Sequence, residues 1–127
     1  MKILIIDNDT SIGTTMKSAL GLNPSYEVDI ALSAKEGLDK MRAQKYDLVL
    51  LDFMMPEISG IDLCKTMVAD PELKKMSVIL VSALPITSKV FQETNGNFQE
   101  LGVIKGLLEK PFGVSDLLDK VAQVIKK

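Results

Sequence analysis

The 127-residue sequence contains no histidine and a single cysteine, Cys64. Without histidine, the chain lacks the side chain that most often serves as a general base or a metal ligand near neutral pH. Any metal must therefore be held mainly by oxygen atoms. A lone cysteine excludes an intramolecular disulfide and fits a reducing compartment.

Long hydrophobic runs, repeats and a strong net charge are also missing. The apolar run at residues 3–6 is interrupted by Asp7, so it is too short for a signal peptide or a membrane span. The net charge of -2 gives no indication of a nucleic-acid surface. We therefore expect a cytoplasmic protein that does not insert into membranes or bind nucleic acid directly.

The composition is that of an ordinary globular protein, with 46% hydrophobic and 25% charged residues. A chain of this length can bury a proper core within one domain. No linker or low-complexity segment interrupts it. We expect a single domain over residues 1–127, without an output domain.

Short apolar runs alternate with segments of helical periodicity. The runs lie at residues 3–6, 28–31, 48–51, 78–81 and 105–108. Helices are predicted from Ile12 to Leu20, after Ser33 with Glu36 as a capping box, after Ser59, at residues 86–101 and from Ser115. Five strands alternating with five helices predict an α/β fold, in which a parallel sheet is covered on both faces.

Polar residues follow these runs at the carboxyl ends of the predicted strands. They are Asp7, Asn8 and Asp9 after the first, Asp52 after the third, Ser82 after the fourth, and Glu109 and Lys110 after the fifth. Parallel strands bring these ends to one edge of the sheet, where open α/β proteins place their sites. Singly, each residue has a structural explanation: Asp9 could cap a helix and Lys110 could be solvated. Their joint placement favours a functional site.

In chain order, four motifs resemble the receiver domain of two-component response regulators over essentially the whole sequence. They are the acidic residues after residues 3–6, the stretch from Asp52 to Gly60 with Met-Pro and Ser-Gly, Ser82-Ala83, and Lys110-Pro111-Phe112. The resemblance implies a doubly wound, flavodoxin-like sheet of order 2-1-3-4-5. It also implies a phosphoprotein that passes on a signal by switching partner binding.

The resemblance assigns a role to each strand-end residue. Asp52 would accept a phosphoryl group from the phosphohistidine of a sensor histidine kinase or phosphotransfer protein. Lys110 and Ser82 would contact phosphoryl oxygens. Mg²⁺, with Mn²⁺ as an alternative, would be held by Asp7, Asn8, Asp9, Asp52 and the backbone carbonyl of Met54. Such a protein is not an enzyme acting on other molecules, because it catalyses only its own phosphorylation and slow dephosphorylation. The sequence does not identify its effector.

Three departures from the family pattern carry predictions. Asn8 is neutral where most members have a second acid, which predicts weakened Mg²⁺ affinity or a ligand role for Asp9. Leu107 replaces a common aromatic residue, so signal transmission would rest on Ser82 and on backbone shifts near Ala83 and Leu84. Met54 and Leu84 are apolar and cannot orient a hydrolytic water, which predicts a long-lived phosphoryl group.

Two other functions fit parts of the sequence. A degenerate receiver would bind partners without phosphorylation. Asn8 and Leu107 favour this alternative, whereas intact Asp52, Ser82 and Lys110 oppose it. A haloacid-dehalogenase-like phosphatase would use Asp7 as nucleophile and Asp9 as acid. That alternative leaves the stretch from Asp52 to Gly60 unexplained. It also calls for a pair of acidic residues at a strand end after the lysine, whereas Asp116 and Asp119 lie inside the last predicted helix.

Overall fold

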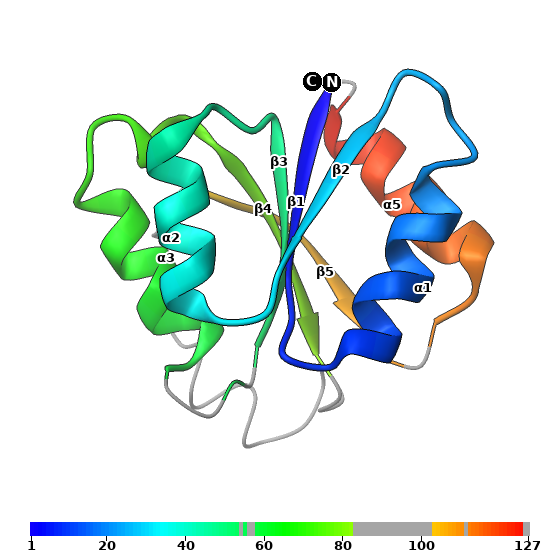
Figure 1. The fold of residues 1–127 in the computed structure, drawn as a ribbon, viewed down its shortest axis with the longest axis horizontal. Coiled ribbons are helices and arrows are strands. Elements are labelled where there is room, and N and C mark those ends of the chain that lie inside the picture. The colour runs from blue at the N-terminus through cyan, green and yellow to red at the C-terminus, as the bar shows by residue number, and fades with distance from the viewer. Residues whose placement is uncertain (54, 56–57, 83–102, 111, 126–127) are drawn as a thin grey trace.

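A computed structural model describes residues 1–53, 55, 58–82, 103–110 and 112–125, which form an open sheet with helices on both faces (Figure 1). In chain order the strands are β1 (Lys2–Ile6), β2 (Glu27–Ala31), β3 (Leu48–Asp52), β4 (Ser77–Ser82) and β5 (Ile104–Glu109). They pair in the order β2-β1-β3-β4-β5, and each neighbouring pair is parallel. The predicted fold class and strand order are confirmed.

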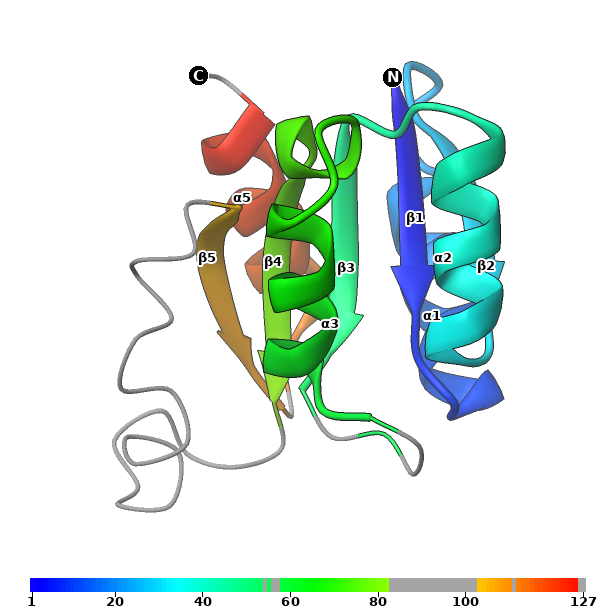
Figure 2. The same cartoon turned by 90° about the vertical axis from the view of Figure 1, so that its left-hand side faces the viewer.

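The described helices form two layers. They are α1 (Thr10–Leu20), α2 (Ala34–Ala43), α3 (Gly60–Val68) and α5 (Val114–Ile125), with a short 3₁₀ helix η1 (Leu73–Lys75). Helices α1 and α5 cover one face of the sheet, and α2 and α3 cover the other (Figures 1 and 2). The helix predicted at residues 86–101 lies outside the described residues.

Two of the predicted helix starts are confirmed by their capping hydrogen bonds. The Ser33 hydroxyl accepts a hydrogen bond from the Glu36 N–H at 3.1 Å, and Glu36 accepts one from the Leu32 N–H at 2.8 Å. The Ser59 hydroxyl accepts a hydrogen bond from the Asp62 N–H at 3.2 Å. These side chains satisfy N–H groups that the first helical turn leaves unpaired.

The predicted start of the last helix at Ser115 is wrong by one residue. Helix α5 begins at Val114. The Leu117 N–H donates to the Gly113 carbonyl at 3.2 Å, while the Asp116 carboxylate accepts from the Gly113 N–H at 3.1 Å. Because Asp116 satisfies this backbone group, the first turn is built on Gly113 and does not need Ser115 as a cap.

The apolar residues of the central strands alternate between two cores. Ile3, Ile5, Leu48 and Leu50 pack with α1 and α5, whereas Leu4, Ile6, Val49 and Leu51 pack with α2 and α3. All eight residues are fully buried. Strands buried on both faces read as continuous apolar runs, because successive side chains point to opposite faces. Such rigid strands hold the residues that follow them in fixed positions.

Candidate functional site

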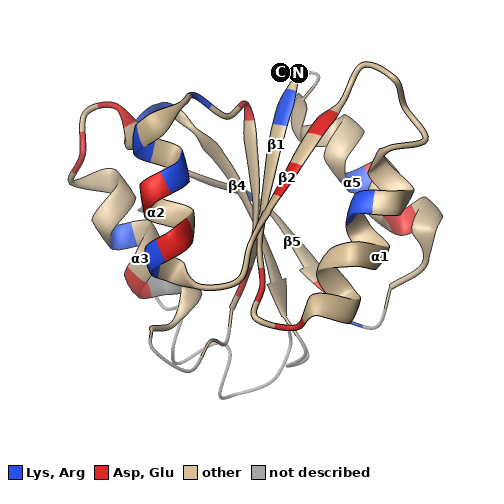
Figure 3. Cartoon of the chain, in the orientation of Figure 1, with Lys and Arg blue, Asp and Glu red and all other residues tan. Residues whose placement is uncertain are grey.

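Four of the predicted site residues lie together at the carboxyl edge of the sheet. Asp7 follows β1, Asp52 ends β3, Ser82 ends β4 and Lys110 follows β5. Figure 3 shows acidic segments where the central strands end. Asp7, Asp52 and Ser82 are 1%, 7% and 2% exposed, and among the described residues they are the three buried polar or charged ones. Buried polar groups gathered at one edge of an α/β sheet indicate a site.

Lys110 joins the ends of β1 and β3 through ion pairs. Its Nζ lies 3.2 Å from Asp7 Oδ2 and 3.4 Å from Asp52 Oδ1. The Lys110 side chain is 15% exposed, so it is sheltered but can still be reached from solvent. One ammonium group thus neutralises part of the charge of two neighbouring carboxylates.

The backbone ladder sets the positions of these side chains. Asp52 pairs with Val81, and the Phe53 N–H donates to the Val81 carbonyl at 2.8 Å. On the other side of β4, Ser82 pairs with Glu109, and the Lys110 N–H donates to the Ser82 carbonyl at 2.6 Å. Because the strand pairing continues to the carboxyl ends of the strands, the backbones of Asp52, Ser82 and Lys110 are held next to one another although these residues are far apart in the sequence.

In the loop after β1, Asp7 belongs to the site and Asp9 caps the following helix. The Asp7 N–H donates to the Ala31 carbonyl at 3.1 Å, and Asp7 Oδ1 accepts from the Asp9 N–H at 2.9 Å. Asp9 is the N-cap of α1, where its Oδ1 accepts from the N–H groups of Ser11 and Ile12. Asn8 is exposed. The capping interpretation of Asp9 is confirmed, whereas metal ligation by Asn8 or Asp9 stays a prediction.

The site suits a hard cation with few protein ligands. Within the described residues, no group of three or more histidine, cysteine, aspartate or glutamate side chains could hold a metal ion. Mg²⁺, however, is usually bound by one or two carboxylates and keeps several waters. The neighbouring carboxylates of Asp7 and Asp52, bridged by Lys110, match that requirement.

Other predicted site residues are not at this edge or are not described. Met54 and Leu84 lie outside the described residues, so their roles stay predictions. Leu107 is partly buried and packs against the core on the α2 and α3 side. It therefore has a structural role in the described fold, and its influence on switching is not tested by that contact.

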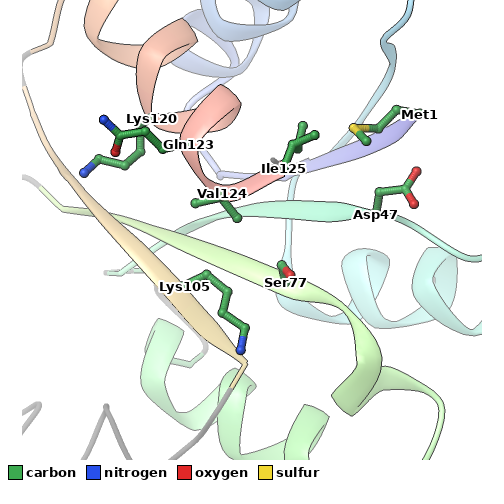
Figure 4. A pocket seen from close by; sticks show the side chains of 8 residues that line it. All are labelled: Met1, Asp47, Ser77, Lys105, Lys120, Gln123, Val124 and Ile125. Carbon is green, nitrogen blue, oxygen red and sulfur yellow. The ribbon is translucent and has the colours of Figure 1, made fainter. Parts of the chain in front are cut away.

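A cavity of about 920 Å³ lies at the opposite, amino edge of the sheet (Figure 4). Its lining includes Asp47 and Ser77 near the starts of β3 and β4, Lys105 of β5, and Val124 of α5. Figure 4 labels two lysines, Lys105 and Lys120, and neither side chain points toward the Asp47 carboxylate. Its lining includes none of Asp7, Asp52, Ser82 and Lys110, so this cavity is separate from the acidic site.

The sequence prediction missed a partly buried polar cluster beside α2. The Tyr46 hydroxyl donates to Asp29 at 2.6 Å and accepts from the Gln44 amide at 2.8 Å, while the Lys2 ammonium donates to Gln44. Burial, followed by the hydrogen bond to Asp29, raises the pKa of Tyr46 to about 12. No local pattern marks this cluster, because its members come from two strand regions and the end of a helix.

The lone thiol is not part of the acidic site. Cys64 is fully buried in α3, and burial raises the pKa of its thiol to about 12. Since the thiolate is the reactive form, a thiol with so high a pKa is inert near neutral pH.

The open parallel sheet and its acidic carboxyl edge agree with the comparisons with known proteins, which show the family. Residues 3–122 match the response regulator receiver domain model, so the chain belongs to the response regulator receiver domain family. Members of this family accept a phosphoryl group in two-component signal transduction, generally bind Mg²⁺ at their acidic pocket and generally partner with histidine kinases. Neither alternative function is favoured by these findings.

The individual relatives are chemotaxis proteins and longer regulators. The chain is 29% identical to chemotaxis protein CheY-3 of Vibrio cholerae serotype O1, covering 100% of this chain and 93% of that protein. It is 27% identical to response regulator ArlR of Staphylococcus saprophyticus, covering 99% of this chain but 53% of that protein. The match to ArlR thus spans about half of the longer protein.

Solved structures give the same result. Chemotaxis response regulator CheY4 of Vibrio cholerae superimposes with a TM-score of 0.84 at 26% identity, covering 97% of each chain. A CheY-like receiver domain protein from Methanospirillum hungatei gives 0.80 at 31% identity, covering 98% of this chain and 93% of that one. Within the described part of the chain, no helix is long and apolar enough to cross a membrane.

Proposed function

We propose that Asp52 is the phosphoryl acceptor of this receiver domain. The observation that carries the proposal is the position of its carboxylate: it is nearly buried at the carboxyl edge of the sheet, with its Oδ1 3.4 Å from the Lys110 ammonium. Phosphoryl transfer depends mostly on positioning and charge neutralisation, so a fixed carboxylate beside a fixed cation suits it. The donor would be the phosphohistidine of a histidine kinase or of a phosphotransfer protein.

Each neighbouring residue has a distinct role in this proposal. An Asp52 oxygen forms the new bond to phosphorus as the bond to the histidine nitrogen breaks. Lys110 supplies a compact positive charge to the transferred group, and the Ser82 hydroxyl donates a hydrogen bond to one of its oxygens. The protein then serves as a signalling switch that catalyses only its own phosphorylation and slow dephosphorylation.

The divalent cation would be held chiefly by Asp7 and Asp52. When bound, Mg²⁺, or Mn²⁺ in its place, would supply positive charge to the phosphoryl oxygens. Asn8 offers a neutral oxygen, and Asp9 Oδ1 already accepts the capping hydrogen bonds of α1. Since only two carboxylates would hold the cation, we expect weak Mg²⁺ binding. Asn8→Asp adds a third carboxylate and should strengthen it, and isothermal titration calorimetry measures both affinities.

Acetyl phosphate tests the proposed function directly. With Mg²⁺ present, the purified protein should gain one phosphoryl group at Asp52, detected by intact mass and by borohydride trapping of the acyl phosphate. Asp52→Asn should abolish labelling, whereas Lys105→Met, which alters an exposed lysine of β5, should leave it unchanged. Labelling at Asp7 would instead support the phosphatase alternative. No labelling at all would support the degenerate interaction module.

A further inference from the structure

Gly60 lies directly against the backbone of the proposed acceptor. It is the first residue of α3 and is buried. Its N–H donates to the Phe53 carbonyl at 2.7 Å, and this hydrogen bond joins the first residue of α3 to the residue that follows β3. The start of the helix is thereby fastened to the residue that follows Asp52.

The close approach leaves no room for a side chain at this position. A Cβ added at Gly60 would lie 2.9 Å from the Asp52 carbonyl oxygen, 3.0 Å from Phe53 Cα and 3.1 Å from Leu80 Cδ2. The φ angle of Gly60 is outside the left-handed region. Glycine is therefore required here for space, and backbone conformation does not demand it.

The two backbone atoms that such a Cβ would meet cannot move independently. Phe53 continues the β3–β4 ladder through its hydrogen bond to Val81, so its Cα is held by the sheet. To relieve the contact, either the start of α3 must move away or the Asp52 peptide must rotate. Because the Asp52 side chain and this peptide share the Asp52 Cα, a displacement that moves this atom changes the distance from the carboxylate to Lys110, which is 3.4 Å in the described structure.

From this geometry we propose that Gly60 is a positioning residue for the phosphoryl acceptor. Its missing side chain allows α3 to begin against the Asp52 backbone, which fixes the direction of the Asp52 carboxylate toward Lys110. The inference rests on the proposed role of Asp52. It concerns how the carboxylate is aimed, and Gly60 itself touches no reacting atom.

Other glycines of the chain have different surroundings. A Cβ at Gly37 would meet only the Ile6 side chain, and one at Gly106 would meet the side chains of Lys120, Val124 and Ile79 at 3.3–3.6 Å. Such contacts affect packing, and side chains can partly adjust to them. Gly106→Ala is therefore the matched control, because it adds the same atom to the sheet region without contacting Asp52.

The first measurement needs neither metal nor phosphodonor. Carboxyl carbon signals of isotopically labelled aspartate report the surroundings of each carboxylate by NMR, and Asp52→Asn assigns the Asp52 signal. Gly60→Ala should move the Asp52 signal, whereas Gly106→Ala should leave it in place. An unchanged Asp52 signal in folded Gly60→Ala would overturn the proposal, whether or not the protein can be phosphorylated.

The second measurement is the rate of phosphorylation by acetyl phosphate with Mg²⁺. Gly60→Ala should slow it by about 10- to 100-fold, because misplacing a reacting group by about 1 Å can cost up to about 100-fold in rate. Gly106→Ala should react at the wild-type rate. A wild-type rate for Gly60→Ala would contradict the positioning role. Failure of the wild-type protein to react would count against the acceptor role of Asp52 instead, and the NMR result would still stand.

A double variant separates positioning from core packing. Leu80→Val removes the side-chain atom 3.1 Å from the added Cβ but leaves the contacts with the Asp52 and Phe53 backbone. Gly60→Ala combined with Leu80→Val should therefore remain slow and keep the displaced Asp52 signal. It also relieves crowding if Gly60→Ala alone does not fold. Recovery of the wild-type rate in the double variant would show that packing against Leu80, and not aiming of Asp52, was responsible.

Discussion

Replacing Lys110 by methionine tests whether the ion pairs at the sheet edge stabilise the protein. Methionine keeps much of the apolar stem and removes the ammonium group. The change leaves Asp7 and Asp52, whose side chains are 1% and 8% exposed, without the cation that lies 3.2 and 3.4 Å from them. Two buried carboxylates then repel each other across a poorly solvated site.

The expected loss follows from the burial of the partners. Removing one member of a buried ion pair costs about 3–5 kcal/mol, because the remaining charge has lost both water and its partner. Lys110 keeps 15% of its side-chain surface exposed, so solvent screens its charge in part. We therefore expect the lower end of that range, about 3 kcal/mol of unfolding free energy.

Urea denaturation followed by circular dichroism at neutral pH measures this loss. Lys105→Met is the matched control, because it makes the same substitution at an exposed position of β5. Added Mg²⁺ should restore part of the stability of Lys110→Met, since a ligand that binds only the folded state stabilises it. If Lys110→Met is destabilised by less than about 0.5 kcal/mol, as expected for surface changes, the ion pairs do not stabilise the fold in solution.

Three further outcomes are expected. Tyr46→Phe should lower the unfolding free energy by about 1–3 kcal/mol near neutral pH, because the Asp29 carboxylate loses a partly buried hydrogen bond. Since the pKa of Tyr46 in the folded protein is raised from 10.0 to about 12, the stability contributed by its hydroxyl is fully present below pH 10 and is lost as the pH rises through 12. If the destabilisation caused by Tyr46→Phe does not shrink between pH 10 and 12, the hydrogen bond from Tyr46 to Asp29 is not the cause. Asp9→Ala should cost about 1 kcal/mol through loss of the α1 cap, and Asp9→Ser should recover most of it; thermal melts compare the two. Cys64 should react with a thiol reagent only as fast as the protein unfolds, because its pKa of about 12 leaves almost no thiolate at neutral pH; rapid labelling of the native protein would refute this.

The sheet was predictable because its signals are local. The runs before Asp7 and Asp52 are buried on both faces, so composition alone distinguishes them from amphipathic helices. Ser33 and Ser59 likewise mark helix starts through hydrogen bonds to nearby residues. The start of α5 was missed because Asp116 bonds to Gly113, which makes Ser115 unnecessary as a cap. The three-residue η1 is too short to produce a periodic pattern.

The site was predictable in its members but not in its contacts. Parallel strand ends must share an edge, which placed Asp7, Asp52, Ser82 and Lys110 together. That Lys110 bridges both carboxylates depends on side-chain distances that no sequence pattern encodes. Asp9 had two plausible roles, and only the geometry of α1 shows that its carboxylate caps the helix. The demand for space at Gly60 is also a tertiary contact.

The separation of the site residues along the chain has a consequence for folding. Lys110 and Asp7 are 103 positions apart, and Lys110 and Asp52 are 58 apart. During synthesis both carboxylates leave the ribosome before the cation that will neutralise them. A chain that ends before Lys110 would have to bury two like charges together, which disfavours a closed but incomplete sheet. Lys110 can therefore neutralise this edge only once β5 has paired with β4, so the acidic edge is the last part of the sheet to be completed.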